Sequence, residues 1–212
     1  MVSRILLDAR DCPQGMMSVI FGKVSCGCAM PYDNLDSAHM KLVQWVRFTW
    51  ELDKLPTLGA ALPAHYFLTA ANRADEKELR AVIERSFVQD TSWGDAIHEV
   101  NSMLDGWLER AFEPEKSGIC LALRHGLRMI GASILLPDPG AGNHLTPGPC
   151  VLMEYRNRGL GTALLVESLR QLRAAGLSRA VALTKNNAPV AKFLYPKFNG
   201  VVTSGDTSAL VA

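Results

Sequence analysis

Arginines and glycines cluster where a predicted strand turns into a predicted helix. The strand ends at Val151–Met153, Arg156 and Arg158 follow it, and Gly159 and Gly161 lie where the helix starts. The first N–H groups of a helix have no partner inside the helix, and the helix dipole adds roughly half a positive charge there. Glycine lets the backbone approach an anion closely because it has no Cβ. The segment therefore predicts a loop that holds a phosphate-bearing cofactor.

Other kinds of loop share some of these residues. A dinucleotide-binding fingerprint requires three glycines and a later acidic residue for the ribose, and this segment does not fit it. A P-loop requires Gly-Lys-Ser/Thr, whereas Gly161 is followed directly by Thr162. An ordinary turn between a strand and a helix, with no ligand, stays open as the alternative.

The sequence around the loop resembles that of the GCN5-related N-acetyltransferases (GNAT family). Arg156, Gly159 and Gly161 fit the family's Arg/Gln-x-x-Gly-x-Gly/Ala pyrophosphate loop. Further along, Phe193–Phe198 is similar to the family's Leu-Tyr-x-Lys segment, and the two motifs occur in the family's order. The resemblance covers roughly residues 66–200. It implies the family's mixed α/β fold, in which central parallel strands part like a V and the pantetheine arm of acetyl-CoA lies between them as an added strand.

The resemblance also implies which residues contact acetyl-CoA. The backbone N–H groups of the loop would bind the pyrophosphate, and the strand before the loop would pair with the pantetheine. Asn187 lies ahead of the second motif, one residue further from Tyr195 than the family pattern has it. The residues expected to bind the cofactor are Val151, Leu152, Met153, Arg156, Asn157, Arg158, Gly159, Leu160, Gly161, Thr162 and Asn187.

Two side chains are candidates for the proton transfers that acyl transfer to an amine requires. The acceptor ammonium must lose a proton, and the departing CoA thiolate must be stabilised. The resemblance assigns the second role to Tyr195, and the alternative is a tyrosine buried for packing. His144 is the candidate general base because it lies on the strand leading into the loop and imidazole titrates near neutral pH. The alternatives are that His144 is a solvent-facing loop residue and that a water chain is the base.

Bulk composition limits the partners and the location. The chain has 212 residues, a formal net charge of +1 and 48% hydrophobic residues, which is typical of a globular protein. A balanced charge argues against nucleic acid or an acidic membrane as a partner. The apolar run Ile5–Leu7 is cut off by Asp8 and is too short for a signal peptide, and no run reaches the length of a membrane span. We expect a cytoplasmic protein.

The five cysteines indicate neither a disulfide framework nor a metal site. Their number is odd, and disulfides are rare in the cytoplasm. A set of Cys12, Cys26, Cys28 and His39 has the ligand chemistry for zinc, but its spacing matches no standard site. Structural thiols and no metal are therefore expected. A covalent acyl-enzyme is not indicated either, because neither motif contains a cysteine.

Hydrophobic periodicity predicts alternating strands and helices after residue 65. Pro147 and Pro149 interrupt the strand before the loop, because proline cannot donate to a ladder. Gly176 is expected to end the helix after the loop. The predicted elements are a strand at 66–71, a helix from Asp75 to Phe87, a helix at 93–112, a hairpin of 119–123 with 129–136, a loop at 137–143, a helix that buries Leu165, Leu169 and Leu172, a strand at 180–184 and a helix at 189–195.

The first 64 residues are predicted to form a separate αβ segment, ahead of an acetyltransferase domain at 65–212. Strands at Ile5–Leu7 and Val19–Phe21 would flank a turn at Cys12–Gly15. The segment is expected to pack on the catalytic domain, to make a homodimer or to wall the acceptor pocket.

A helix is predicted at the end of this segment. Asp36 or Ser37 would cap it, and it would run to about Leu55. Three large aromatics on one helix indicate a core or an interdomain face more than a ligand cage. These aromatics are Trp45, Phe48 and Trp50.

The leading hypothesis is an acetyl-CoA-dependent N-acetyltransferase that transfers the acetyl group directly to a primary amine. Small amines, amino-acid derivatives, and protein N-termini or lysines all stay open as acceptors, since the net charge provides no field to choose between them. A rival from another class is a non-catalytic acyl-CoA-binding or regulatory module with the same fold. A third hypothesis is transfer of a longer acyl group, which depends on the width of the pocket.

Overall fold

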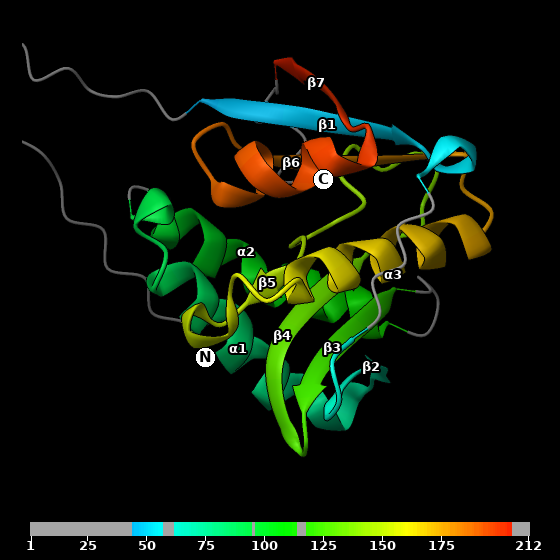
Figure 1. The fold of residues 1–212 in the computed structure, drawn as a ribbon. Helices are drawn as coiled ribbons and strands as arrows, with labels where there is room; N and C mark the ends of the chain where they lie inside the picture. The colour runs from blue at the N-terminus through cyan, green and yellow to red at the C-terminus, as the bar shows by residue number, and fades with distance from the viewer. Residues whose placement is uncertain (1–43, 57–61, 95, 114–117, 205–212) are drawn as a thin grey trace, which may run out of the picture. The chain divides into compact units, whose positions relative to one another are not determined.

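Two antiparallel sheets form the frame of the protein. The computed structural model describes residues 44–56, 62–94, 96–113 and 118–204, which belong to one compact unit, Lys41–Ala212. In the first sheet the strand order is β2 (Tyr66–Ala71), β3 (Ile119–His125), β4 (Arg128–Leu135) and β5 (Cys150–Val151). In the second it is β6 (Arg179–Lys185), β1 (Trp45–Glu51) and β7 (Val201–Ser204) (Figure 1).

Three α-helices within the described ranges pack on these sheets. α1 (Glu76–Val88) contacts β4 and β5 and packs against α2 (Ile97–Phe112), while α3 (Leu160–Ala174) contacts strands of both sheets (Figure 1). Each helix turns an apolar stripe toward the core and a polar face outward. The predicted stripe of α3 is confirmed, since Leu165, Leu169 and Leu172 are buried, and α2 buries Val100, Leu104 and Leu108.

The predicted mixed α/β fold is confirmed, and most element boundaries agree within a few residues. α2 starts at Ile97, later than predicted, because Asp90 caps a separate 3₁₀ turn at Thr91–Trp93 and accepts the N–H of Ser92 at 3.1 Å. The helix predicted at 189–195 is present as a π-helical turn, Val190–Leu194, that continues into the 3₁₀ turn Tyr195–Phe198.

Gly176 ends α3 as predicted. It has a φ of +94°, a left-handed conformation that glycine adopts without strain. The next residue, Leu177, donates its N–H to Leu172 O at 3.2 Å, which closes the helix end.

The predicted helix over Trp45, Phe48 and Trp50 is wrong, because these residues lie on strand β1. Phe48 and Trp50 are buried and alternate with more exposed neighbours, which is the period of a strand. Phe48 faces Ala182 and Trp50 faces Ala180 across the pair with β6, so that large rings lie opposite small side chains. β1 lies between β6 and β7, so the predicted N-terminal segment contributes a strand to this sheet (Figure 1).

Several N-terminal predictions lie outside the described residues. They concern the strands at Ile5–Leu7 and Val19–Phe21, the start of the helix at Asp36 or Ser37, and the set of Cys12, Cys26, Cys28 and His39. Within the described ranges, no group of three His, Cys, Asp or Glu side chains is placed to hold a metal ion, and no helix is long and apolar enough to cross a bilayer. The domain boundary between residues 64 and 65, and the role of residues 1–43, stay predictions.

The two sheets are joined beside β5 and part beyond that point. His144 donates its backbone N–H to Val181 O at 2.8 Å, which connects the chain before β5 to β6. β5 itself pairs with β4, and no pairing of β5 with β6 occurs in the described structure. Pro147 and Pro149, just before β5, have no N–H with which to extend a ladder. A gap therefore opens between β5 and β6, and it positions the candidate site.

Candidate functional site

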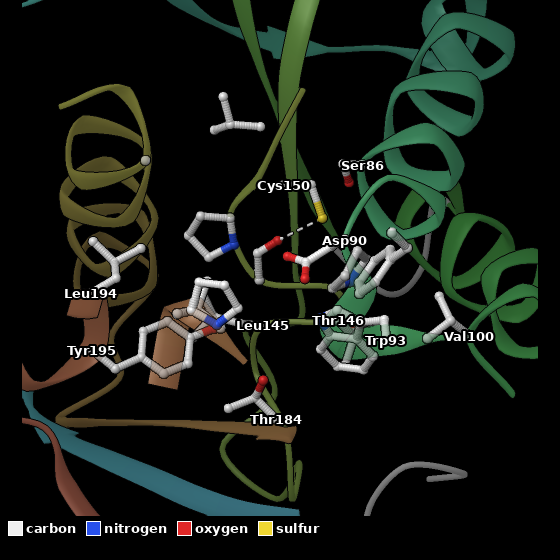
Figure 2. A pocket seen from close by; sticks show the side chains of 18 of the residues that line it. Ser86, Asp90, Trp93, Val100, Leu145, Thr146, Cys150, Thr184, Leu194 and Tyr195 are labelled. Atoms are coloured by element: carbon white, nitrogen blue, oxygen red, sulfur yellow. Dashed lines mark hydrogen bonds between the residues drawn. The ribbon is translucent and has the colours of Figure 1, made fainter. Parts of the chain in front are cut away.

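A pocket lies in the gap between β5 and β6. In Figure 2, Tyr195 and Leu194 lie on one side of it, and Trp93, Val100 and Ser86 lie on the opposite side. We define two parts by their lining residues. The loop end comprises Arg156, Asn157 and Gly161, from the loop before α3 and its first turn, and the aromatic end comprises Trp45, Phe87, Trp93, Val100, Met103 and Trp107.

The loop before α3 has the backbone geometry of an anion-binding helix start. Gly159 directly precedes α3 with a φ of +77°, and a Cβ built on it would meet no atom within 4 Å. Ala163 donates its N–H to Gly159 O at 3.0 Å. The N–H groups of Leu160, Gly161 and Thr162 therefore precede the first bond of the helix ladder. These donors and the helix dipole favour a phosphate group at this point.

Arg156 is turned into the protein and ties the loop to α1. Its Nε donates to Val151 O at 2.9 Å, its Nη1 to Asp90 Oδ2 at 2.8 Å and its Nη2 to Ser86 O at 2.9 Å. The side chain of Asp90 is 11% exposed and that of Arg156 is 24% exposed, so water screens this ion pair only in part. The guanidinium predicted to face the phosphate instead fixes the position of the loop.

The structure brings together only part of the predicted cofactor set. Arg158 is exposed on the loop, where its Nη2 donates to Glu154 O at 3.1 Å. Asn187 is exposed in the turn after β6, outside the pocket lining. Four predicted residues line the pocket: Val151, Arg156, Asn157 and Gly161. Outside the lining are Leu152, Met153, Arg158, Gly159, Leu160, Thr162 and Asn187, of which Gly159, Leu160 and Thr162 form the start of α3.

Tyr195 lines the pocket and is held rigidly. It is buried, and its ring packs edge-on against Phe48 at 5.1 Å and Trp50 at 5.0 Å between centroids. Its hydroxyl lies against Gly148, where a Cβ would collide with the oxygen, so a glycine is needed there. Burial raises the pKa of Tyr195 well above its ordinary value of 10.0, and the nearby Cys150 raises it further. The phenol is therefore protonated at neutral pH and has a proton to donate.

His144 lies apart from the pocket, although it was the predicted base. It is buried, and its Nδ1 accepts the N–H of Val181 at 3.0 Å, while its Nε2 lies 3.0 Å from Asp138 O. Nε2 must then donate to that carbonyl, which defines a neutral ring with both nitrogens occupied. His144 does not line the pocket. This geometry indicates that the His144 imidazole has a structural role, in which it joins the two sheets. It indicates neither a general base nor a solvent-facing histidine.

We expect His144 to make the fold less stable in acid. Burial lowers the pKa of His144 below its ordinary value of 6.5, so on acidification the unfolded chain binds a proton before the folded one does. The stability due to this group is thus present above pH 6.5 and is lost as the pH falls toward the lowered pKa. Denaturant unfolding across this pH range should show that the free energy of unfolding decreases as the pH falls. In His144→Gln, which has no titratable ring, the decrease should be smaller by the contribution of His144. An identical decline in the variant would contradict the assignment.

Cys150 is a pocket residue that the motifs did not mark. Its Sγ lies 3.3 Å from Gly148 O as a donor, and burial raises the pKa of the thiol to about 12. A thiol must lose its proton to act as a nucleophile. Cys150 is therefore poorly suited to form an acyl-enzyme.

The residues of the aromatic end were also missed by the sequence analysis. Trp93 and Trp107 belong to the predicted α2 region, and Trp107 follows the stripe residue Leu104 by one helical turn. Helical spacing of this kind is equally typical of a core residue and of a residue that lines a pocket, so it could not identify Trp107 as a pocket residue. Thr146 and Thr184, which flank the gap, carry no sequence signal at all.

Comparisons with known proteins agree on one family. Residues 77–200 match the family described as the acetyltransferase (GNAT) family. A GCN5-related N-acetyltransferase from Sphaerobacter thermophilus superposes with a TM-score of 0.55 at 17% identity, over 76% of this chain and 49% of that one. A GNAT-family putative acetyltransferase from Novosphingobium aromaticivorans gives a TM-score of 0.50 at 16% identity, over 76% of this chain and 61% of that one.

A Drosophila protein gives a TM-score of 0.51 at 13% identity, over 76% of this chain and 48% of that one. At these identities the structures share the fold alone, and this chain spans 48% to 61% of the length of the three. No curated protein matches the sequence.

Proposed function

Because this chain belongs to the GNAT acetyltransferase family, we propose that it is an N-acetyltransferase that transfers the acetyl group of acetyl-CoA directly to a primary amine. One observation supports this best: Gly161, in the first turn of α3, and the buried Tyr195 line one and the same pocket. A CoA thioester carries a pyrophosphate and a leaving sulfur, and these two features suit the two groups.

The donor substrate is assigned to the loop end and the gap. Its pyrophosphate would lie at the N–H groups of Leu160, Gly161 and Thr162, with the exposed Arg158 adding charge at the surface. Its pantetheine arm would extend along β5, where no strand competes for the gap. Val151 O already accepts from Arg156, so pairing with the arm would rest on other backbone groups of this segment.

Tyr195 is proposed as the acid for the leaving sulfur. The amine nitrogen attacks the thioester carbonyl carbon, the C–N bond forms, and the C–S bond breaks as the electron pair moves to sulfur. The phenol then donates its proton to the thiolate, and the nitrogen releases one proton, which restores the phenol. The ring packing of Tyr195 against Phe48 and Trp50 holds the hydroxyl in place for this transfer. The direct transfer needs no enzyme nucleophile, which agrees with the protonated thiol of Cys150.

Release of CoA thiol from acetyl-CoA in the presence of a panel of primary amines tests this function. Amine-dependent release, with the acetylated amine identified by mass spectrometry, would support it. Binding of acetyl-CoA without release across the panel would favour the alternative, a regulatory module with the same fold. A pantetheine contact from Asn187, a cytoplasmic location and a homodimer stay predictions.

A further inference from the structure

We propose that the acceptor is a weakly basic primary amine on a flat apolar body, as in an aryl amine, which enters the pocket uncharged. The inference rests on the acetyl transfer proposed above and narrows its acceptor. Three independent features of the pocket support it: an aromatic wall, the absence of a free base among the described lining residues, and buried polar atoms without partners.

The aromatic end is a wall of rings that suits a flat apolar molecule. Trp93 meets Trp45 at 6.0 Å and Phe87 at 4.7 Å between centroids, both edge-on, and all three rings line the pocket. Lys185 Nζ lies 5.8 Å from the centroid of the Trp93 ring. Trp107 and Met103 from α2 extend this wall. Aromatic side chains of this kind bind rings by stacking and by burial of apolar area.

The described lining offers no free group to hold or deprotonate an ammonium ion. Asp90 is its only carboxylate, and no histidine of the described chain lines the pocket. The oxygens of Asp90 already accept from Arg156 Nη1 at 2.8 Å, from Ser92 Oγ at 2.6 Å and from Ser92 N–H at 3.1 Å. Burial of an ammonium without a free counter-charge is costly, so a neutral amine is favoured. Tyr195 and Cys150 are both protonated at neutral pH and cannot take its proton.

Three buried polar atoms of the lining lack a hydrogen-bond partner among the described residues. They are Thr146 Oγ1, Thr184 Oγ1 and Trp107 Nε1, and their residues are at most 4% exposed. In Figure 2 Thr184 lies between the tyrosine side and the tryptophan side of the pocket. Buried polar atoms are normally paired, and a polar group of a bound ligand is one way to pair these three. A threonine hydroxyl can accept an N–H group of a neutral amine and leave the lone pair of the nitrogen free to attack.

The protons of the acetyl transfer balance without a general base from the protein. A neutral amine attacks the thioester carbon, and the nitrogen becomes acidic once the C–N bond has formed. The C–S bond breaks, Tyr195 gives its proton to the sulfur, and the proton lost from nitrogen returns to the phenolate of Tyr195, directly or through water. One proton thus moves from nitrogen to sulfur, and the products are an N-substituted acetamide and CoA thiol.

A pair of isomeric amines tests the acceptor class with the complete chain. In 4-ethylaniline the nitrogen is on the ring and is neutral at neutral pH, whereas 2-phenylethylamine has the same atoms and is an ammonium ion there. We expect kcat/KM at neutral pH, measured by CoA thiol release, to be higher for 4-ethylaniline by roughly tenfold or more, because only a small fraction of the isomer is uncharged. The value for 2-phenylethylamine should rise by about tenfold per pH unit toward the pKa of that amine.

The outcomes separate this inference from the proposed function. Preference for 2-phenylethylamine or for a lysine amide at neutral pH would overturn the acceptor class and leave acetyl transfer standing. No CoA release with any amine would overturn the proposed function, and this inference with it.

Threonine variants test the two hydroxyls. Thr146→Val and Thr184→Val keep the shape and remove one hydroxyl each, and each should lower kcat/KM for 4-ethylaniline by roughly three- to tenfold with the acetyl-CoA Kd unchanged. Their thermal stability should be equal to that of the parent protein or higher, since an unpartnered buried hydroxyl is lost. Thr203→Val, on the exposed strand β7, is the matched control. Unchanged kcat/KM in both pocket variants would contradict the assignment of the hydroxyls to the acceptor.

Discussion

Replacement of Tyr195 by phenylalanine is expected to lower kcat for acetyl transfer by roughly 100-fold or more, because a positioned acid contributes about that much. The ring would keep its packing against Phe48 and Trp50, so the fold and the acetyl-CoA Kd should not change. Thiol release gives kcat, and calorimetry gives the Kd. This split between turnover and binding distinguishes an acid from a tyrosine that only fills the core.

The matched control is Tyr66→Phe, which removes a phenol outside the pocket lining. The Tyr66 hydroxyl accepts from Arg158 Nη1 at 3.3 Å and touches no reacting group, so kcat at saturating acetyl-CoA should stay within about twofold of the parent value. Burial raises the pKa of Tyr195 above 10.0, so the activity of the parent protein should show no loss from ionisation of this phenol below that pH. A kcat for Tyr195→Phe close to that of the parent would contradict the acid role.

Arg156→Gln is expected to destabilise the protein by about 2–3 kcal/mol, because it leaves the mostly buried carboxylate of Asp90 without its charged partner. The loop should also lose its tether to α1, since Arg156 provides the bonds to Asp90 Oδ2 and Ser86 O. Denaturant unfolding would measure the loss. Acetyl-CoA affinity should fall as a consequence of the displaced loop.

Two further variants separate a tether from a phosphate ligand. Arg158→Gln changes an exposed arginine of the same loop and should cost less than about 1 kcal/mol of stability. Asp90→Asn combined with Arg156→Gln should recover part of the stability lost in the single variant, because no unpaired charge is then buried. Normal stability with weakened acetyl-CoA binding in Arg156→Gln would show instead that Arg156 acts on the phosphate, as the sequence alone predicts.

Local patterns were enough to predict most elements after residue 65. The helix start after Gly159 and the end of α3 at Gly176 follow from residue types at fixed spacing, and the structure has them where predicted. These features depend on neighbours in the sequence. The same holds for the buried stripes of α2 and α3. The strand before the loop is shorter than predicted, because β5 ends at Val151 and Met153–Tyr155 forms a 3₁₀ turn.

Features that depend on distant pairing could not be predicted in the same way. Trp45–Glu51 is a strand because β6, more than 120 residues later, provides alanines opposite its rings. Arg156 turns inward because α1 and the turn after it place Ser86 and Asp90 nearby, and no local pattern indicates this. His144 was chosen by its position before the loop, but its ring is fixed by β6.

Calorimetric titration with acetyl-CoA tests most directly whether the start of α3 holds the cofactor. The parent protein is expected to bind one equivalent, and Gly159→Ala to raise the Kd by about tenfold or more, because the added Cβ would obstruct a phosphate at the proposed position, beside the first N–H groups of α3. The matched control is Gly176→Ala at the other end of α3, which also has a positive φ and open space around its Cβ and should lose stability alone. Equal Kd values for the parent, Gly159→Ala and Gly176→Ala would contradict the central claim.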